Sequence, residues 1–280
     1  MRKIVDRNYL QSPKLRDYLA ESRRNRVVLT DYAAMEAFKG DALINIVTAT
    51  EILREFPKQV IVLKSTNVIV GLKGRRCGFT RRMVDRDQTR GFPEWCEHLA
   101  RAAAGDKDLQ RQIVESGKEA DAHLKRMRDD QQNYAEIPNA MAKKFSEAEL
   151  KLLRKREPIS DEMFGKVQGH VLEMAAFLFT AHPNFVELPT ARELPYTFIF
   201  RYAMVGYLIA LRWMSVGGAR NVKPEKIRND IVDGTYAAYA TYFQDFLSLD
   251  AGANEIYADA KFLIGLFLAT PPLPDHVARG

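Results

Sequence analysis

The chain has 280 residues, 46% of them hydrophobic, which is enough to bury a core and excludes a small scaffold held by disulfides or metal. Its net charge of +6 and pI of about 9.2 favour a polyanionic partner, nucleic acid first. The two cysteines, Cys77 and Cys96, match no zinc-binding spacing and are expected to be ordinary thiols of a reducing compartment.

Three short apolar runs near the N-terminus predict strands, and each of the first two is followed by helical segments. The predicted strands cover residues 3–5, 27–29 and 60–63, and the predicted helices cover 9–22, 32–38 and 41–56. Such alternation is typical of a parallel sheet with helices packed over it. A further apolar run at 246–249 predicts a late strand, followed by a helix over 251–268. The expected fold class is α/β.

The character of the sequence changes at about residue 72. Residues 72–190 are charged and mostly helical in composition, with helices expected over 106–128 and after the N-caps Ser146 and Ser160. We expect this segment to be an insertion between two parts of one core. The predicted domains are the first core part at 1–71, the insertion at 72–190, the second core part at 191–270 and a tail at 271–280.

The location is expected to be cytoplasmic. The N-terminus lacks the apolar core of a signal peptide. The most hydrophobic run, residues 196–214, contains Arg201 and Arg212, and a charge inside a membrane span is costly. This run is therefore expected to be a buried helix, and no membrane partner is expected.

Acidic residues occupy corresponding places on these elements. Asp6 follows the first strand, Glu36 lies in the helix after the second, and Asp250 follows the last strand. Asp230 and Asp233 lie three residues apart in a late helical run, so both can occupy one helix face. Carboxylates that converge repel unless a cation lies between them, and oxygen ligands without Cys or His favour Mg²⁺ or Mn²⁺.

Each acid also has a structural interpretation. Asp230 and Asp250 are of the residue type that caps helices, as is Asp41. Glu36, among alanines, also fits a surface position. Asp6 is harder to explain in this way, because a lone carboxylate directly after a buried strand needs a partner.

The order of these parts resembles that of the PIN-domain nucleases. The resemblance rests on Asp6 in IVDRNYL, Glu36 in TDYAAMEAF, Asp230 or Asp233 in the late helix, and Asp250 after FLSL, and covers about residues 1–70 and 220–268. It implies a PIN-like fold with a pocket of acids that binds divalent metal and hydrolyses phosphodiester bonds. The implied substrate is nucleic acid, RNA in preference to DNA, and the implied role includes a toxin or defence effector.

Specific roles follow for the acids of such a site. Asp6 is expected to be the central metal ligand, with Asp250 and either Asp233 or Asp230 as further ligands. Glu36 is expected to orient a metal-bound water. Asp31 and Asp245 are expected to contact the metal ligands without binding the metal themselves.

An arginine-rich segment follows the third strand. A charge run is usually a solvated surface, but with Phe79 and Phe92 nearby this one also suits phosphate and base contacts. The arginines predicted to bind nucleic acid are Arg75, Arg76, Arg81, Arg82 and Arg86. A homodimer and an inhibitory or activating protein are further possible partners.

Two other functional classes stay open. One is a noncatalytic nucleic-acid-binding or regulatory protein on a PIN-like fold, which predicts binding without cleavage. The other is a different metal-dependent phosphohydrolase acting on nucleotides. The chain contains neither GxxxxGK[ST] nor GxGxxG, which argues against the second.

Overall fold

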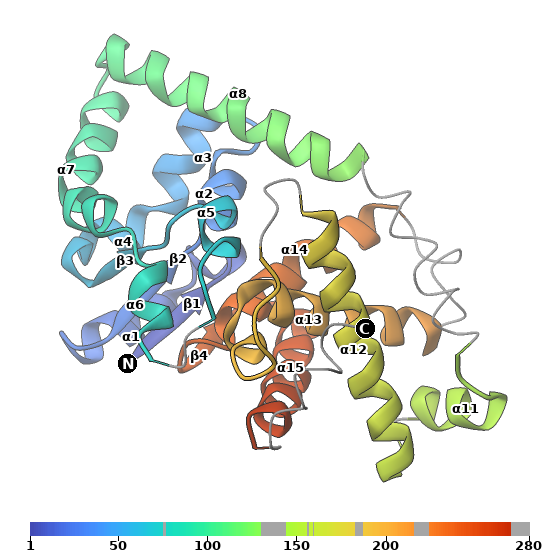
Figure 1. Ribbon diagram of the computed structural model, residues 1–280. Coiled ribbons are helices and arrows are strands. Elements are labelled where there is room, and N and C mark those ends of the chain that lie inside the picture. The colour runs from blue at the N-terminus through green and yellow to red at the C-terminus, as the bar shows by residue number, and fades with distance from the viewer. Residues whose placement is uncertain are drawn as a thin grey trace. The chain divides into compact units, whose positions relative to one another are not determined.

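Two compact units make up the chain in the computed structural model (Figure 1). The sheet unit comprises residues 1–69, 80–127 and 242–254, and the helical unit comprises 70–79, 128–241 and 255–280. Within them the structure describes residues 1–74, 77–129, 144–155, 157–158, 160–182, 187–215 and 224–269. The predicted domain boundaries at 71 and 190 do not coincide with these units, and the core-plus-insertion division stays a prediction.

The sheet unit contains a four-stranded, wholly parallel sheet in the order β3-β2-β1-β4. The strands are β1 (Arg2–Val5), β2 (Arg26–Leu29), β3 (Val60–Val62) and β4 (Asp245–Leu247). Ile4 is aligned with Val28 on one side and Phe246 on the other. The predicted α/β class with a parallel sheet is confirmed, and β1 lies between the second strand and the last.

Side chains on both faces of the sheet are buried. Val5, Val27 and Val60 share one face and belong to a single apolar cluster, while Ile4 and Val28 on the other face are 0% exposed. Such unbroken hydrophobicity is typical of parallel strands, which are covered on two sides.

The helices of the sheet unit cover the Val5 face of the sheet through that apolar cluster. Helix α7 packs against β3 and α3. The helices and 3-10 turns that lie wholly or partly in this unit are η1 (Arg7–Tyr9), α1 (Pro13–Glu21), α2 (Asp31–Phe38), α3 (Ala42–Ala49), α4 (Glu51–Glu55), η2 (Pro57–Gln59), α5 (Thr66–Val70), α6 (Phe79–Met83), α7 (Arg86–Ala103), α8 (Lys107–Asp129) and α15 (Ala251–Ala269).

Helix bounds differ most from the predicted ones at two places. The first helix begins at Pro13 instead of Tyr9, because proline is favoured in the first turn of a helix and Ser12 before it is extended. The predicted helix over 41–56 is divided at Thr50, whose backbone leaves the helical region with ψ near 5°. The helix predicted over 106–128 is confirmed as α8.

The helical unit is built around α13 (Phe198–Ser215). This helix packs against α12 (Asp161–Ala181), α14 (Pro224–Ala240) and α11 (Glu147–Lys155), and Figure 1 shows it between α12 and α14. The turn η3 (Leu194–Tyr196) precedes it.

Two predicted N-caps of this unit are confirmed. The Ser160 hydroxyl accepts a hydrogen bond from the Met163 amide, and Ser146 and Glu149 form a reciprocal capping box. These caps begin α12 and α11.

The apolar run predicted to be a buried helix forms α13. Its Arg201 is 5% exposed and donates to the carbonyl oxygens of Pro195 and Thr241. Among the described residues, no helix combines the length and the hydropathy needed to cross a membrane.

Candidate functional site at the C-terminal edge of the sheet

Asp6 follows β1 at the edge where open parallel sheets place their ligand sites. Its side chain lies beside the end of β4, because the Asp6 amide donates to the Leu247 carbonyl at 2.9 Å. The residue is only 4% exposed. Its Oδ2 accepts a hydrogen bond of 2.7 Å from the Ser248 hydroxyl, so this carboxylate joins the end of the inner strand β1 to the end of the edge strand β4.

Asp250 is connected to the same hydroxyl. The Asp250 amide donates to Ser248 Oγ at 3.0 Å, so Ser248 lies between the two acidic residues. The Asp250 Oδ1 atom also accepts from the Ala253 amide at 2.9 Å and thereby caps α15. The predicted capping role of Asp250 is therefore present together with its proximity to Asp6.

Two asparagines complete the network. Asn8 accepts from the Leu249 amide at 2.9 Å and donates to Ser248 Oγ at 3.3 Å. Asn254 donates to the carbonyl oxygens of Ser248 and Asp250 at 2.9 and 2.8 Å. These bonds fix the loop after β4 against the loop after β1, so the acids are carried on a rigid frame.

Burial raises the pKa of Asp6 above its ordinary value. The hydrogen bonds from Ser248 and from the amides of Arg7 and Asn8 lower that pKa, and the neighbouring Asp250 carboxylate raises it. No lysine or arginine of the described chain forms an ion pair with Asp6. The site therefore holds a buried acid whose ionised form is uncompensated by cationic side chains.

Asp31 lies after β2 at the same edge. Its carboxylate accepts from the Thr66 amide at 2.6 Å, the Thr66 hydroxyl at 2.8 Å and the Tyr32 amide at 3.0 Å. Burial raises its pKa, and the bonds from Thr66 oppose that effect. Asp31 therefore links the start of α2 to the start of α5.

The other predicted acids have different surroundings. Glu36 is half-buried in α2 of the sheet unit. Asp245 begins β4 and pairs with Lys3 at 2.9 Å.

Asp230 and Asp233 belong to α14 of the helical unit, where Asp233 is half-buried. Asp230 accepts from Trp213 Nε1 at 2.7 Å and from Lys226 Nζ at 2.8 Å. Its carboxylate thus has a structural role within that unit.

The part of the chain that the structure describes contains no group of three or more His, Cys, Asp or Glu side chains arranged to hold a metal ion. Two of the four predicted acids, Asp6 and Asp250, are nevertheless adjacent. Magnesium commonly keeps several waters and uses only one or two carboxylates together with substrate phosphates. This pair fits such an open site and does not form a closed cage.

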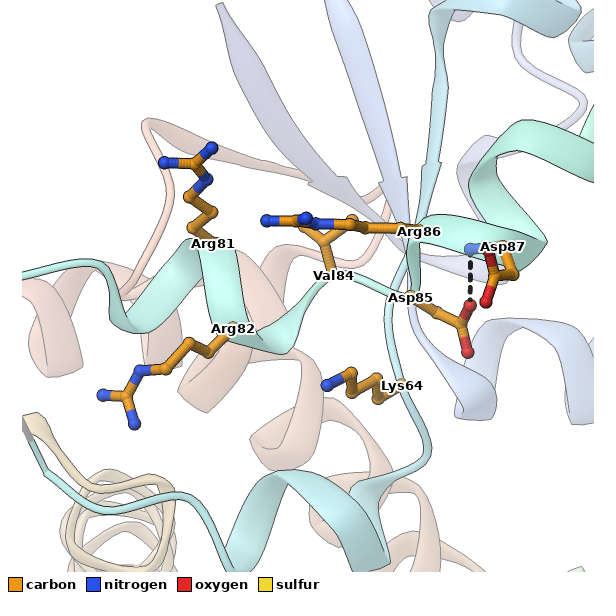
Figure 2. A pocket seen from close by; sticks show the side chains of 7 residues that line it. All are labelled: Lys64, Arg81, Arg82, Val84, Asp85, Arg86 and Asp87. Atoms are coloured by element: carbon orange, nitrogen blue, oxygen red, sulfur yellow. Dashed lines mark hydrogen bonds between the residues drawn. The ribbon is translucent and has the colours of Figure 1, made fainter.

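The predicted nucleic-acid-binding arginines fall into two groups. Arg75 and Arg76 lie outside the described residues. Arg81, Arg82 and Arg86 line a pocket of about 520 Å³ in the sheet unit. The remaining lining residues are Lys64, Val84, Asp85 and Asp87 (Figure 2).

Sequence reasoning missed Asn8, Ser248 and Lys64. A signal for the first two was present, since Asn8 follows Asp6 by two positions and Ser248 precedes Asp250 by two. Short polar residues directly after buried strands often bond to nearby backbone groups. Lys64 had no comparable signal, because only the return of the chain to β3 places it beside the arginines.

Comparisons of the chain with models of known families, with curated proteins and with solved structures found no match. The resemblance to the PIN-domain nucleases therefore stays a prediction from the residues.

Proposed function

We propose that the protein is a divalent-metal-dependent nuclease of PIN-like type that hydrolyses phosphodiester bonds, with RNA preferred over DNA. The observation that carries this proposal is the buried Asp6 carboxyl group beside Asp250 at the C-terminal edge of the sheet. The same pair was expected from the sequence as two of the metal ligands.

The electrostatics of the pair support a cation site. Burying a carboxylate without a cationic partner is costly, and a second carboxylate nearby adds to that cost. Asp6 has hydrogen-bond donors but, among the described residues, no ion-pair partner. A chain that keeps such an acid on a rigid frame gains a binding site for a cation at the expense of stability.

Asp6 and Asp250 would hold the metal, Mg²⁺ or Mn²⁺, through carboxylate oxygens. A bound divalent ion supplies an activated water and stabilises charge on the phosphodiester oxygens. Ser248 holds the Asp6 carboxylate in one orientation, and Asn8 holds the backbone of the loop that carries Asp250. Such supporting bonds keep ligands in place before the metal binds.

Asp233 stays the proposed acid of α14, as the sequence pattern has it. Glu36 stays the proposed acid for orienting water. Both assignments rest on the sequence pattern and are tested by substitution.

The experiment is cleavage of end-labelled single-stranded RNA, single-stranded DNA and duplex DNA with Mn²⁺, Mg²⁺ or EDTA. We expect metal-dependent cleavage that falls at least about 100-fold in Asp6→Asn and in Asp250→Asn. Asparagine caps helices as well as aspartate does, so Asp250→Asn should keep α15 intact. Asp233→Asn and Glu36→Gln test the remaining acids, with Asp230→Asn as a comparison.

The exposed Asp121 in α8 provides the control, because Asp121→Asn removes one carboxylate from the same unit without touching the site. Cleavage that survives in both Asp6→Asn and Asp250→Asn would come from a contaminant or another site and would overturn the proposal.

A noncatalytic nucleic-acid-binding protein is the second candidate. It is favoured by the absence of a three-acid group among the described residues and by the capping role of Asp250. It predicts binding that is unchanged by EDTA and no cleavage with either metal.

A further inference from the structure

The pocket lined by Lys64, Arg81, Arg82 and Arg86 is built onto the end of β3. The Lys64 amide donates to the Met83 carbonyl and the Asp85 amide to the Val62 carbonyl, each at 2.9 Å. Leu63 and Val84 form an antiparallel bridge. These bonds hold the turn between α6 and α7 against the strand, so the basic side chains start from a fixed backbone.

The two acids of the pocket are occupied elsewhere. Asp85 Oδ1 accepts from the amides of Asp87 and Gln88 and so caps α7. Asp87 pairs with Arg90 at 3.6 Å. Figure 2 shows the carboxylates of Asp85 and Asp87 on the α7 side, whereas the side chains of Lys64 and Arg82 extend in the other direction.

Three of the basic groups of the pocket are available to a ligand. Within the described chain, Lys64, Arg81 and Arg86 form no ion pair with an acid. Arg81 and Arg86 are exposed to solvent. Clustered cations that lack acidic partners favour an anion, and the guanidinium groups suit phosphate oxygens in particular.

The pocket lies at the same sheet edge as Asp6. The pairing of β1, β2 and β3 places Asp6, Thr30 and Leu63 in one row, and Lys64 follows Leu63. Since β1 and β3 are separated by two strand spacings, this row spans roughly 10 Å. One nucleic-acid strand is long enough to contact both places.

We propose that this pocket binds a backbone phosphate of a single nucleic-acid strand whose neighbouring segment lies at Asp6 and Asp250. The proposal rests on the nuclease function proposed above and adds its substrate class, single-stranded over duplex. The hollow of about 520 Å³ is open to solvent, and a single strand, which bends far more easily than a stiff duplex, can turn one phosphate into it while its neighbouring segment lies at Asp6. Lys64, Arg81 and Arg86 supply the phosphate contacts.

The test measures binding without cleavage. A short 3′-labelled oligonucleotide is titrated with protein in EDTA, and anisotropy gives Kd between about 50 and 200 mM NaCl. The variant Lys64→Gln/Arg86→Gln is compared with Arg23→Gln/Arg24→Gln. The control removes the same two charges from an exposed turn before β2, at the opposite edge of the sheet.

We expect Lys64→Gln/Arg86→Gln to weaken single-strand binding by on the order of tenfold and to reduce the salt slope by about 0.7, the value for one phosphate contact on a single strand, whereas the control changes Kd less than about twofold. Duplex of the same length should bind more weakly, and its Kd should be the same for both double variants. Strands with a 5′-phosphate and a 5′-hydroxyl should bind alike, since the ligand is a backbone phosphate.

Three results would overturn the inference. If both double variants lose the same amount of single-strand affinity, the loss is an effect of net charge. If Lys64→Gln/Arg86→Gln weakens duplex binding as much as single-strand binding, the pocket has no preference for single strands. If a strand with a 5′-phosphate binds much more tightly than one with a 5′-hydroxyl, the ligand is a terminal phosphate and not a backbone phosphate. The nuclease proposal is judged separately by cleavage, so each can fail alone. A melting curve of each variant confirms that it is folded.

Discussion

The Ser248 hydroxyl donates a 2.7 Å hydrogen bond to Asp6, although the two residues lie 242 positions apart in the chain. This bond connects the end of β1 with the end of β4. The carboxylate that it holds is buried and has no ion-pair partner among the described residues, so stability and function should respond oppositely to changes at Asp6.

Asp6→Asn is expected to stabilise the protein while it removes cleavage. Burial raises the pKa of Asp6 in the folded state above its value in the unfolded state. Between these two pKa values the folded chain binds the proton more tightly than the unfolded chain does, so the stability of the protein falls as pH rises from the lower value to the higher one. Asparagine carries no charge to desolvate and keeps one acceptor oxygen, and the loss of the second acceptor for the donors Ser248, Arg7 and Asn8 offsets part of this gain. We expect about 1 kcal/mol at neutral pH, or roughly 2–4 °C in melting temperature.

Thermal unfolding in EDTA across the pH range measures this effect. The advantage of Asp6→Asn should grow from acidic to neutral pH, whereas Asp121→Asn, at an exposed position, should follow the wild type. A lower melting temperature for Asp6→Asn at neutral pH would contradict the argument.

Ser248→Ala is expected to destabilise the protein by about 1–3 kcal/mol, because the Asp250 amide and Asn8 lose an acceptor. The Ser248 bond also lowers the pKa of Asp6, so its loss should raise that pKa further. Since a metal ligand must be ionised, the acid limb of the pH–rate profile should move to higher pH. Ser160→Ala removes a cap of similar strength from α12 and should leave the profile unmoved.

Added Mn²⁺ or Mg²⁺ is expected to raise the melting temperature of the wild type relative to EDTA. A ligand that binds only the folded state stabilises it by about 2.7 kcal/mol at a concentration one hundred times its Kd. The variant Asp6→Asn/Asp250→Asn should show no such shift. If it shifts as much as the wild type does, the metal binds elsewhere.

Asp31→Ala is expected to cost about 1–3 kcal/mol, because its carboxylate accepts two bonds from Thr66. In urea unfolding, Asp31→Ala and Thr66→Ala should be non-additive when combined, since each removes part of the same contact. Asp31 has a structural role in this interpretation, so cleavage should change less than about tenfold. A loss comparable to that of Asp6→Asn would place Asp31 among the catalytic acids.

Two arginines of α13 should differ in importance for stability. Arg201 is buried and donates to two backbone carbonyls and the Thr241 hydroxyl, so Arg201→Met should cost about 2–3 kcal/mol. Arg212 pairs with the partly exposed Glu255 and Asp259, and Arg212→Met should cost less than about 1 kcal/mol. Urea unfolding of the two variants compares these values, and equal costs would contradict the distinction.

Much of the local structure was predictable from the sequence by itself. Strand runs such as residues 60–63, the capping box at Ser146 and the cap at Ser160 depend on neighbours within a few positions, and all are present. The parallel sheet followed from alternating strands and helices. Asp6 was also predicted as a functional residue, because a carboxylate directly after a buried strand needs a partner.

Only the tertiary structure decided which of these residues meet. The bond from Ser248 to Asp6 depends on β4 pairing beside β1, and the basic pocket depends on Met83 and Val84 returning to the end of β3. Such contacts arise from the burial of whole elements and not from local sequence pattern. The bonds from Trp213 and Lys226 to Asp230 likewise depend on how the helices pack, and the sequence pattern did not predict them.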